Sequence, residues 1–319
     1  MFALRKIYLF VIFVSPLYLL YGQQSSLNPI SSWIYNPITY NPAIAGSKDF
    51  FSVDLIAASR ESNNSQVISG NTRLSKKIPG YFTSPGYSRY TNFGLGGYIF
   101  NESSGLSRTM GVSATGSYQV NLSESSLSFL SFGVSIKGIY NTMDSVSQVE
   151  PDLTTTGSET FEPNMDVGIY YYGPTFYTGI SSTNLLGNTS KTDSAGLYIP
   201  EARQYFLMGG YKFILSRYLD IVLEPSLIIS ASDSTFRDIT KNINPLIKLY
   251  IEDFCIGTYF YDKTKISFFF QYNYPRFYIG AFFALPKKSP YFKKEPCIEF
   301  SAGINLSYNK SRLHKRYHW

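Results

Sequence analysis

The sequence predicts an all-β protein, a transmembrane antiparallel β-barrel of about 14 strands preceded by an N-terminal extended Asn-Pro segment. Three observations predict this fold class. Aromatic residues make up 17% of the 319-residue chain and charged residues only 16%, which is below the roughly 25% of charged residues in an average soluble domain. After residue 22, no run reaches the ~18 consecutive apolar residues of a membrane-spanning helix. Long stretches alternate instead between apolar and polar residues.

The N-terminus has the features of a secretory signal peptide. Arg5 and Lys6 precede an apolar run at 7–21, and the small residue Gly22 follows it. Signal peptides have basic, apolar and small-residue regions in this order. We therefore expect cleavage near Gly22 and a location in the outer membrane of a Gram-negative bacterium. An uncleaved membrane anchor is the alternative, which Pro16 and the shortness of the run disfavour.

The alternating pattern is clear near the C-terminus. At 297–308, Phe300 and Ile304 would face one side of a strand and Glu299 the other, and the segment 108–121 repeats the pattern. Such runs are longer than the ~5 to 6 residues of a typical strand in a soluble protein. They match the ~9 to 11 residues of a tilted membrane-spanning strand. The apolar face would then meet lipid and the polar face the lumen.

Fourteen segments of this kind follow one another. They are 49–60, 65–76, 91–101, 108–121, 126–140, 162–173, 174–185, 203–216, 218–231, 237–250, 252–262, 264–274, 276–286 and 297–308. An even number is expected when both ends of a barrel lie in the periplasm. The expected organisation is therefore a signal peptide at 1–22, a periplasmic or lumenal segment at 23–48, the barrel at 49–308 and a basic tail at 309–319.

The lengths of the connections fit this count. If the first strand runs outward, connections after even-numbered strands are periplasmic and short, as "YGPT" at 172–175 is. The long connections 141–161 and 186–202 follow odd-numbered strands. The segment 77–90 is the exception, and is either a structured periplasmic loop or a sign that the count slips there.

Charged residues on the polar faces are expected in the lumen, where they can pair or meet water. They are Asp54, Lys137, Asp166, Glu224, Lys248 and Glu299. A catalytic set is disfavoured, because the only histidines, His314 and His318, lie in the C-terminal tail and acid–base chemistry most often uses an imidazole. We predict no catalytic residues, no cofactor, no metal site, no small-molecule substrate and no nucleic-acid partner.

The two cysteines are expected as free thiols. Cys255 and Cys297 fall near opposite ends of the predicted barrel. A disulfide requires alpha carbons within roughly 7 Å of each other. Two buried or lumenal thiols are therefore predicted.

The stretch "WIYNPITYNPAIAG" at 33–46 fits neither a helix nor a spanning strand. Each proline fixes its own backbone and moves the preceding asparagine away from helical geometry. Together with the aromatic residues, this pattern predicts an extended segment that docks in or under the barrel mouth. We therefore take seven of its residues as candidate partner-binding positions: Trp33, Tyr35, Asn36, Pro37, Tyr40, Asn41 and Pro42.

Several of these stretches resemble one protein family. "YNPITYNPAIAGS" after the signal peptide, "EPNMDVGIYYYGPTFYTGISSTNLLG" at 162–187, "YFLMGGYKF" at 205–213 and "LEPSLII" at 223–229 resemble the PorP/SprF family of type IX secretion proteins. The resemblance implies a non-enzymatic outer-membrane barrel that serves the secretion and gliding machinery as accessory or anchor for particular secreted proteins. The implied partners are outer-membrane lipid, periplasmic ring proteins and a secreted adhesin.

Two other functions compete with this one. A passive porin or solute transporter is equally compatible with a barrel. An outer-membrane hydrolase or acyltransferase is disfavoured, because no histidine lies in the barrel.

Two basic clusters complete the candidate binding sites. The expected extracellular loop "KKSPYFKKEP" contains Lys287, Lys288, Lys293 and Lys294, which would attract lipid phosphates or an acidic partner. The tail contains Lys310, Arg312, Lys315 and Arg316, which we expect to contact a partner in the periplasm. A solvated loop and a frayed chain end are the respective alternatives.

Overall fold

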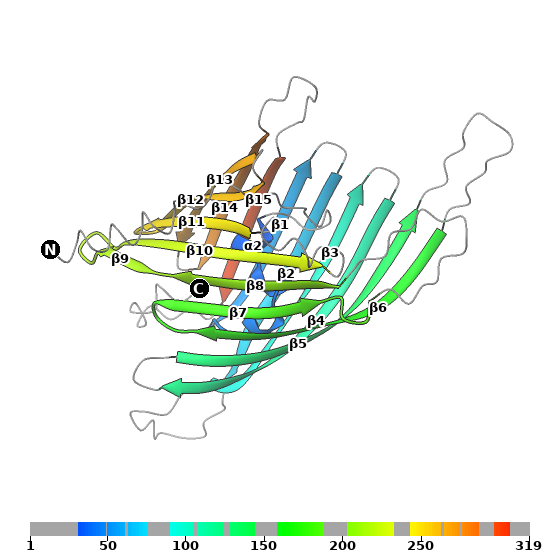
Figure 1. Ribbon diagram of the computed structural model, residues 1–319, viewed down its shortest axis with the longest axis horizontal. Helices are drawn as coiled ribbons and strands as arrows, with labels where there is room; N and C mark the ends of the chain where they lie inside the picture. Colours follow the sequence, from blue (N-terminus) through cyan, green and yellow to red (C-terminus); the bar gives the residue numbers. More distant parts are fainter. Residues whose placement is uncertain are drawn as a thin grey trace.

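The structure is a computed structural model, and most of its described residues lie in the wall of one barrel (Figure 1). It describes residues 31–48, 50–60, 63–75, 90–104, 107–123, 128–143, 158–187, 203–232, 243–262, 265–274, 276–286 and 297–306. The strands are β1 (Phe51–Arg60), β2 (Asn63–Ser75), β3 (Tyr90–Ser104), β4 (Ser107–Ser123), β5 (Ser128–Met143), β6 (Ser158–Tyr172), β7 (Phe176–Thr183), β8 (Gln204–Tyr211), β9 (Phe213–Ser216), β10 (Ile221–Ser232), β11 (Ile243–Ile251), β12 (Phe254–Asp262), β13 (Lys265–Tyr274), β14 (Phe277–Pro286) and β15 (Cys297–Leu306).

The strands close into a 14-stranded antiparallel barrel. Neighbours along the chain pair with one another, and β1 pairs with β15, which joins the two ends of the sheet. The labels run to β15 because β8 and β9 both pair along β10 and form a single barrel strand that is interrupted at Lys212. The predicted fold class is confirmed, and each of the fourteen predicted segments overlaps one barrel strand.

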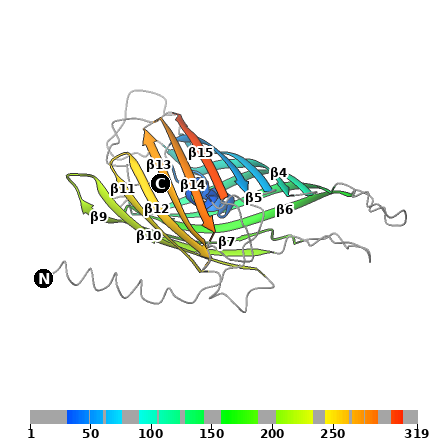
Figure 2. The ribbon, with the colours of Figure 1, turned by 90° about the horizontal axis from the view of Figure 1, so that it is seen from above.

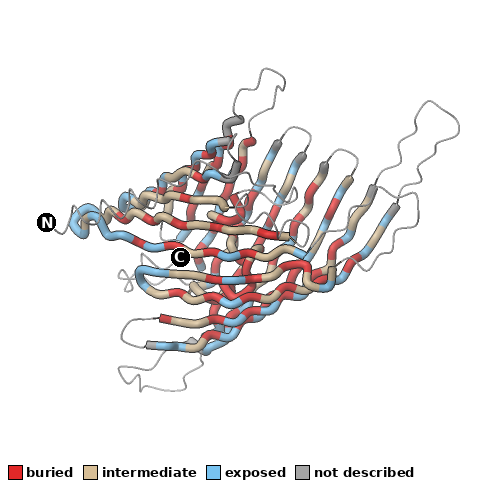
Figure 3. The backbone as a smooth tube through the Cα atoms, viewed as in Figure 1, coloured by how far each residue is buried: buried red, intermediate tan, exposed pale blue. Residues whose placement is uncertain are grey.

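Burial alternates along the strands, as the period of two requires (Figure 3). In β15, Glu299 is fully buried, whereas the side chains of Phe300 and Ile304 are 60% and 54% exposed on the outer face. An apolar outer face suits lipid, because hydrocarbon offers no partners to polar groups. The polar residues of the same strands therefore point inward.

The inner face also holds the residues that precede β1. The prediction of an extended segment was wrong: these residues form three single helical turns, namely α2 (Ser32–Tyr35), η1 (Pro37–Thr39) and η2 (Pro42–Ile44). Asn36 and Asn41, which precede the prolines, have non-helical backbone angles and separate the turns. Figure 2 shows this short coil inside the ring of strands. Its side chains join the buried core, with Ala43 and Ala45 fully buried. Among the described residues, no helix is long and apolar enough to span a membrane.

Candidate functional site: a strap across the barrel lumen

Residues 31–46, called the strap below, contact the inner wall on both sides of the lumen. The first turn packs against β1 and the last turn against β4, β5 and β6. Single contacts extend this range to β13, β14 and β15 on one side and to β7 and β8 on the other. The strap therefore lies across the lumen as a brace between strands from both ends of the chain.

A row of small residues on the inner wall forms the seat of the strap. Gly94 of β3 pairs with Ser117 of β4, Ser117 with Gly133 of β5, Gly133 with Gly168 of β6, and Gly168 with Ser181 of β7. Pairing register places these five residues side by side across five strands. The row lies near one end of the barrel, since Gly168 is close to the end of β6 and the turn at 173–175.

The glycines of this row leave room for the strap backbone. A Cβ atom added to Gly133 would overlap Ala43 and Pro42, one on Gly168 would overlap the Asn41 side chain, and one on Gly94 would overlap Ala45. Any larger residue would therefore push the strap off the wall. These wall positions are filled by the strap rather than by side chains of their own.

Hydroxyl and amide groups of the wall hold the strap by its carbonyl groups. Ser117 Oγ donates to the Ala45 carbonyl at 2.6 Å, and Gln119 Nε2 donates to the same oxygen at 3.1 Å. Ser181 Oγ donates to the Tyr40 carbonyl at 2.6 Å. These buried groups would be costly to leave without partners, so the strap and the wall satisfy each other.

Asn41 is the best-satisfied side chain of the strap. Its Nδ2 donates to the Ile169 carbonyl at 3.2 Å and approaches Met208 Sδ at 3.8 Å. Its Oδ1 accepts from the Ala43 backbone N–H at 2.9 Å and caps the turn that begins at Pro42. Proline suits this position, because its missing N–H would have had no partner there. The second Asn-Pro pair is thus a capped turn locked against β6.

Tyr35 attaches the other end of the strap. Its hydroxyl lies 3.1 Å from the carbonyl oxygen of Phe270 and 3.3 Å from that of Ala281, on the paired strands β13 and β14. Its ring stacks on Tyr278 with the ring centres 6.2 Å apart, and Gly280 provides the space beside it. Burial raises the pKa of the Tyr35 hydroxyl above its ordinary value, so the hydroxyl remains a donor at neutral pH.

The first residue of the strap meets a buried carboxylate. The Ser31 backbone N–H donates to Glu299 Oε2 at 2.8 Å, and the Cys297 thiol donates to Glu299 Oε1 at 3.4 Å. Aromatic rings continue the contact across the lumen: Trp33 packs edge-on against Tyr40, and Tyr40 against Phe206 of β8. The aromatic residues predicted to dock the segment therefore lie in the lumen, in contact with each other and with the wall.

Four of the other lumenal charges form two buried pairs, and Asp54 is buried beside the Ser52 hydroxyl. Lys137 Nζ lies 2.8 Å from Asp166 Oδ1, and Lys248 Nζ lies 3.1 Å from Glu224 Oε1. Glu224 also accepts from the Tyr177 hydroxyl at 2.8 Å. The described residues contain no group of three or more His, Cys, Asp or Glu side chains that could hold a metal ion. Each pair joins two neighbouring strands of the wall, β5 with β6 and β10 with β11.

Neither cysteine forms a disulfide and both are buried, as expected. Following the register through β13 and β14 places Cys255 level with Ser301, four residues along β15 from Cys297. Because barrel strands are tilted, this register level does not run around the barrel at constant height. Cys255 is the second residue of β12 and Cys297 the first of β15. These two strands run in opposite directions, so the thiols lie near opposite ends of the barrel, as expected. They remain three strands apart, on β12 and β15.

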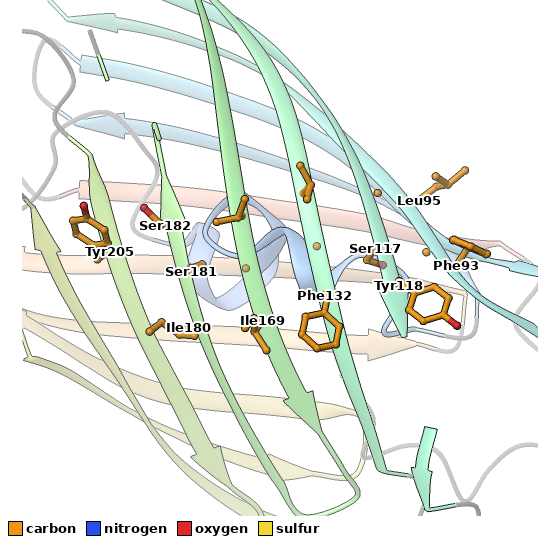
Figure 4. A pocket seen from close by; sticks show the side chains of 16 residues that line it. Phe93, Leu95, Ser117, Tyr118, Phe132, Ile169, Ile180, Ser181, Ser182 and Tyr205 are labelled. Atoms are coloured by element: carbon orange, nitrogen blue, oxygen red, sulfur yellow. The ribbon is translucent and has the colours of Figure 1, made fainter. Parts of the chain in front are cut away.

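The outer face behind the seat carries an apolar groove of about 770 Å³. Phe93, Tyr118, Phe132 and Ile180 line it, and their side chains are exposed on the lipid side. Figure 4 shows these side chains on the strands in front of the strap coil. Because Gly133 and its neighbours in the row lack bulk, one layer of backbone separates the strap from this groove.

Only some of the predicted site residues lie in the part of the chain that the structure describes. Trp33, Tyr35, Asn36, Pro37, Tyr40, Asn41 and Pro42 are all in the strap. The basic clusters, Lys287, Lys288, Lys293, Lys294, Lys310, Arg312, Lys315 and Arg316, lie outside the described residues. Sequence reasoning missed the seat itself and the groups Ser117, Gln119 and Ser181. Glycine or serine at inward-facing strand positions is the signal that could have revealed them.

Comparison with known proteins identifies the family. The family described as type IX secretion system membrane protein PorP/SprF matches residues 22–303. The chain belongs to this family. No curated protein matches it significantly in sequence.

PorP/SprF is a family of secretion-system membrane barrels and not a known class of enzyme. Its barrel fold and its place in type IX secretion point to the outer membrane. Membership also implies association with the secretion machinery.

Solved structures give remote likenesses only. BamA from Haemophilus ducreyi lacking POTRA domains 1–3 is 12% identical, with 81% of this chain and 71% of that chain covered and a TM-score of 0.38. Omp33 of Acinetobacter baumannii is 11% identical, with 82% and 100% covered and a TM-score of 0.32. The KdgM porin is 9% identical, with 79% and 98% covered and a TM-score of 0.34. Scores this low carry no argument about function.

Proposed function

We propose that the chain is a non-enzymatic accessory or anchor barrel of the type IX secretion and gliding machinery, which acts in the export or surface attachment of specific secreted proteins. Cleavage near Gly22 would leave the strap close to the mature N-terminus. The partners would be outer-membrane lipid, periplasmic ring proteins and a secreted adhesin. Family membership supports the assignment to the type IX machinery. The strap supports a role in binding proteins rather than in conducting solutes.

The strap is the observation that carries this proposal over a porin. A porin needs an aqueous path, whereas here Trp33, Tyr35 and Ala43 lie buried in the lumen against the wall. The wall glycines fit the strap backbone closely, so the strap across the lumen belongs to the design of the barrel. A barrel braced in this way is suited to act as a rigid membrane scaffold on which other proteins dock.

Two further surfaces are proposed as docking positions for these partners. The loop with Lys287, Lys288, Lys293 and Lys294 would bind lipid phosphate or an acidic segment of the secreted protein. The tail with Lys310, Arg312, Lys315 and Arg316 would contact the periplasmic ring proteins. Both proposed docking surfaces rest on charge alone. Salt-dependent binding that is lost on Lys→Gln and Arg→Gln replacement would support them.

Two measurements test the function. The full-length chain, carrying a tag in a loop, is isolated from native envelopes, and the proteins bound to it are identified by mass spectrometry. We expect secretion components or a secreted adhesin, and we expect little conductance when the same preparation is placed in a planar bilayer. Steady porin-like conductance from a preparation without protein partners would overturn the proposal in favour of a solute pore.

A further inference from the structure

The strap consists of two parts that are held in different ways. Residues 40–46, called the anchor, lie on the glycine row, and their carbonyl groups accept hydrogen bonds from Ser117, Gln119 and Ser181. Residues 31–36, called the arm, contact one glycine recess, at Gly280. The anchor therefore packs closely against the wall along its whole length, whereas the arm is attached mainly at its two ends.

Buried polar side chains of the anchor and of the arm also differ in whether they have hydrogen-bond partners. Both polar atoms of the Asn41 amide have partners. In the arm, Ser31 Oγ, Ser32 Oγ and both amide atoms of Asn36 are buried and make no hydrogen bond with a described protein group. A buried polar group without a partner is unfavourable by comparison with the same group in water. Moving the arm into water would therefore relieve four such atoms while breaking the hydrogen bonds at its two ends, those of Ser31 and Tyr35. Moving the anchor would break satisfied bonds and relieve no such atom of the Asn41 amide.

Chain connectivity gives the arm its direction of movement. The anchor ends at Gly46, whose positive φ turns the chain towards β1, which begins at Phe51. The arm lies at the far end of the strap from this short tether. The arm can therefore leave the wall while the anchor remains attached.

We propose that the strap is a gate inside the lumen, with a fixed anchor and a releasable arm. When the arm leaves, the wall of β13, β14 and β15 becomes accessible from the lumen, and the anchor stays on β3 to β7. The gate is set by contacts within this chain, so it can operate and be measured without any of the partners proposed above.

Thiol labelling of the full-length chain tests the gate. In a background of Cys255→Ala with Cys297→Ala, single cysteines are introduced as Ser32→Cys in the arm and Ile44→Cys in the anchor. Tyr218→Cys, at a side chain that is 95% exposed, gives the rate for an open position. We expect Ser32→Cys to react with a polar maleimide about tenfold faster than Ile44→Cys, because labelling of a buried thiol follows how often its segment opens.

Heat-modifiable gel migration confirms that each variant has a folded barrel. Equal rates, a faster anchor, or no reaction at Ser32→Cys while Tyr218→Cys reacts would each overturn the gate. If an introduced cysteine prevents folding, the native Cys297 is a second reporter, since it donates to the same carboxylate that holds Ser31. With Cys255→Ala, adding Tyr35→Phe removes the hydroxyl at the other end of the arm and should speed the reaction of Cys297. An unchanged rate would contradict the proposal.

Discussion

Gly133 and Ala43 are in such close contact that a Cβ atom on the glycine would overlap the backbone of the strap. The contact joins the sixth residue of β5 to the turn that begins at Pro42 of the second Asn-Pro pair. Strap and wall are therefore matched in shape as well as in hydrogen bonding, and this match can be tested one residue at a time.

Replacing Gly133 with valine should displace the anchor without destroying the barrel, because valine is a good strand residue. We expect faster proteolysis within residues 33–46 and higher conductance. The matched control is Gly116→Val on the neighbouring strand β4, where an added Cβ meets nothing within 4 Å. Equal protease resistance in the two variants would show that the seat does not hold the strap.

The two Asn-Pro pairs should differ sharply in importance. Asn41→Ala removes a bond to the Ile169 carbonyl and the cap on Ala43, and we expect strap docking to weaken by about 1–3 kcal/mol. Asn36→Ala removes an amide that bonds to no described group, so it should have little effect or a stabilising one. Protease protection of the strap as a function of urea compares the two, and a larger loss in Asn36→Ala would contradict the assignment.

Tyr35 should make docking of the arm sensitive to high pH only. Its pKa in the folded chain is raised above the ordinary 10.0 by burial, so the neutral hydroxyl is favoured in the docked state. The stabilisation is complete below the ordinary pKa and decreases as the pH rises above it towards the folded pKa. Cys297 labelling should be constant from neutral pH to roughly 10, once corrected for thiol ionisation, and increase above that. Tyr35→Phe should remove the increase.

The Lys137 and Asp166 pair should stabilise the wall only when both members are present. Asp166→Asn leaves a buried ammonium without its carboxylate and should lower the free energy of unfolding by about 3–5 kcal/mol. Lys137→Met should do likewise, because Asp166 is itself almost fully buried. The double variant should recover part of the loss, and a double-mutant cycle from urea unfolding in liposomes measures the coupling. Strictly additive losses would mean that the two charges do not interact.

The sequence predicted the wall well, because the strand pattern is local: alternation in β15 is visible in ten consecutive residues. Docking of the strap was also expected, from its prolines and aromatic residues. The seat could not be predicted in this way. Gly94, Ser117, Gly133 and Gly168 have no common spacing in the chain and become one row only through the pairing register of four strands.

The same limit applies to the two asparagines. Asn36 and Asn41 both stand in Tyr-Asn-Pro, and only the wall beside each distinguishes the satisfied amide from the unsatisfied one.

The strap also imposes an order of events on the newly made protein. Ser31 bonds to Glu299 across 268 positions, and Tyr35 bonds to Phe270 across 235. The strap is therefore synthesised well before the strands that it binds. Contacts of such long sequence separation form slowly. During that interval the aromatic residues of the strap have no wall to cover them, and they are exposed to any factor in the envelope that recognises unassembled barrels. The pairing of β1 with β15 joins two strands that the strap itself contacts.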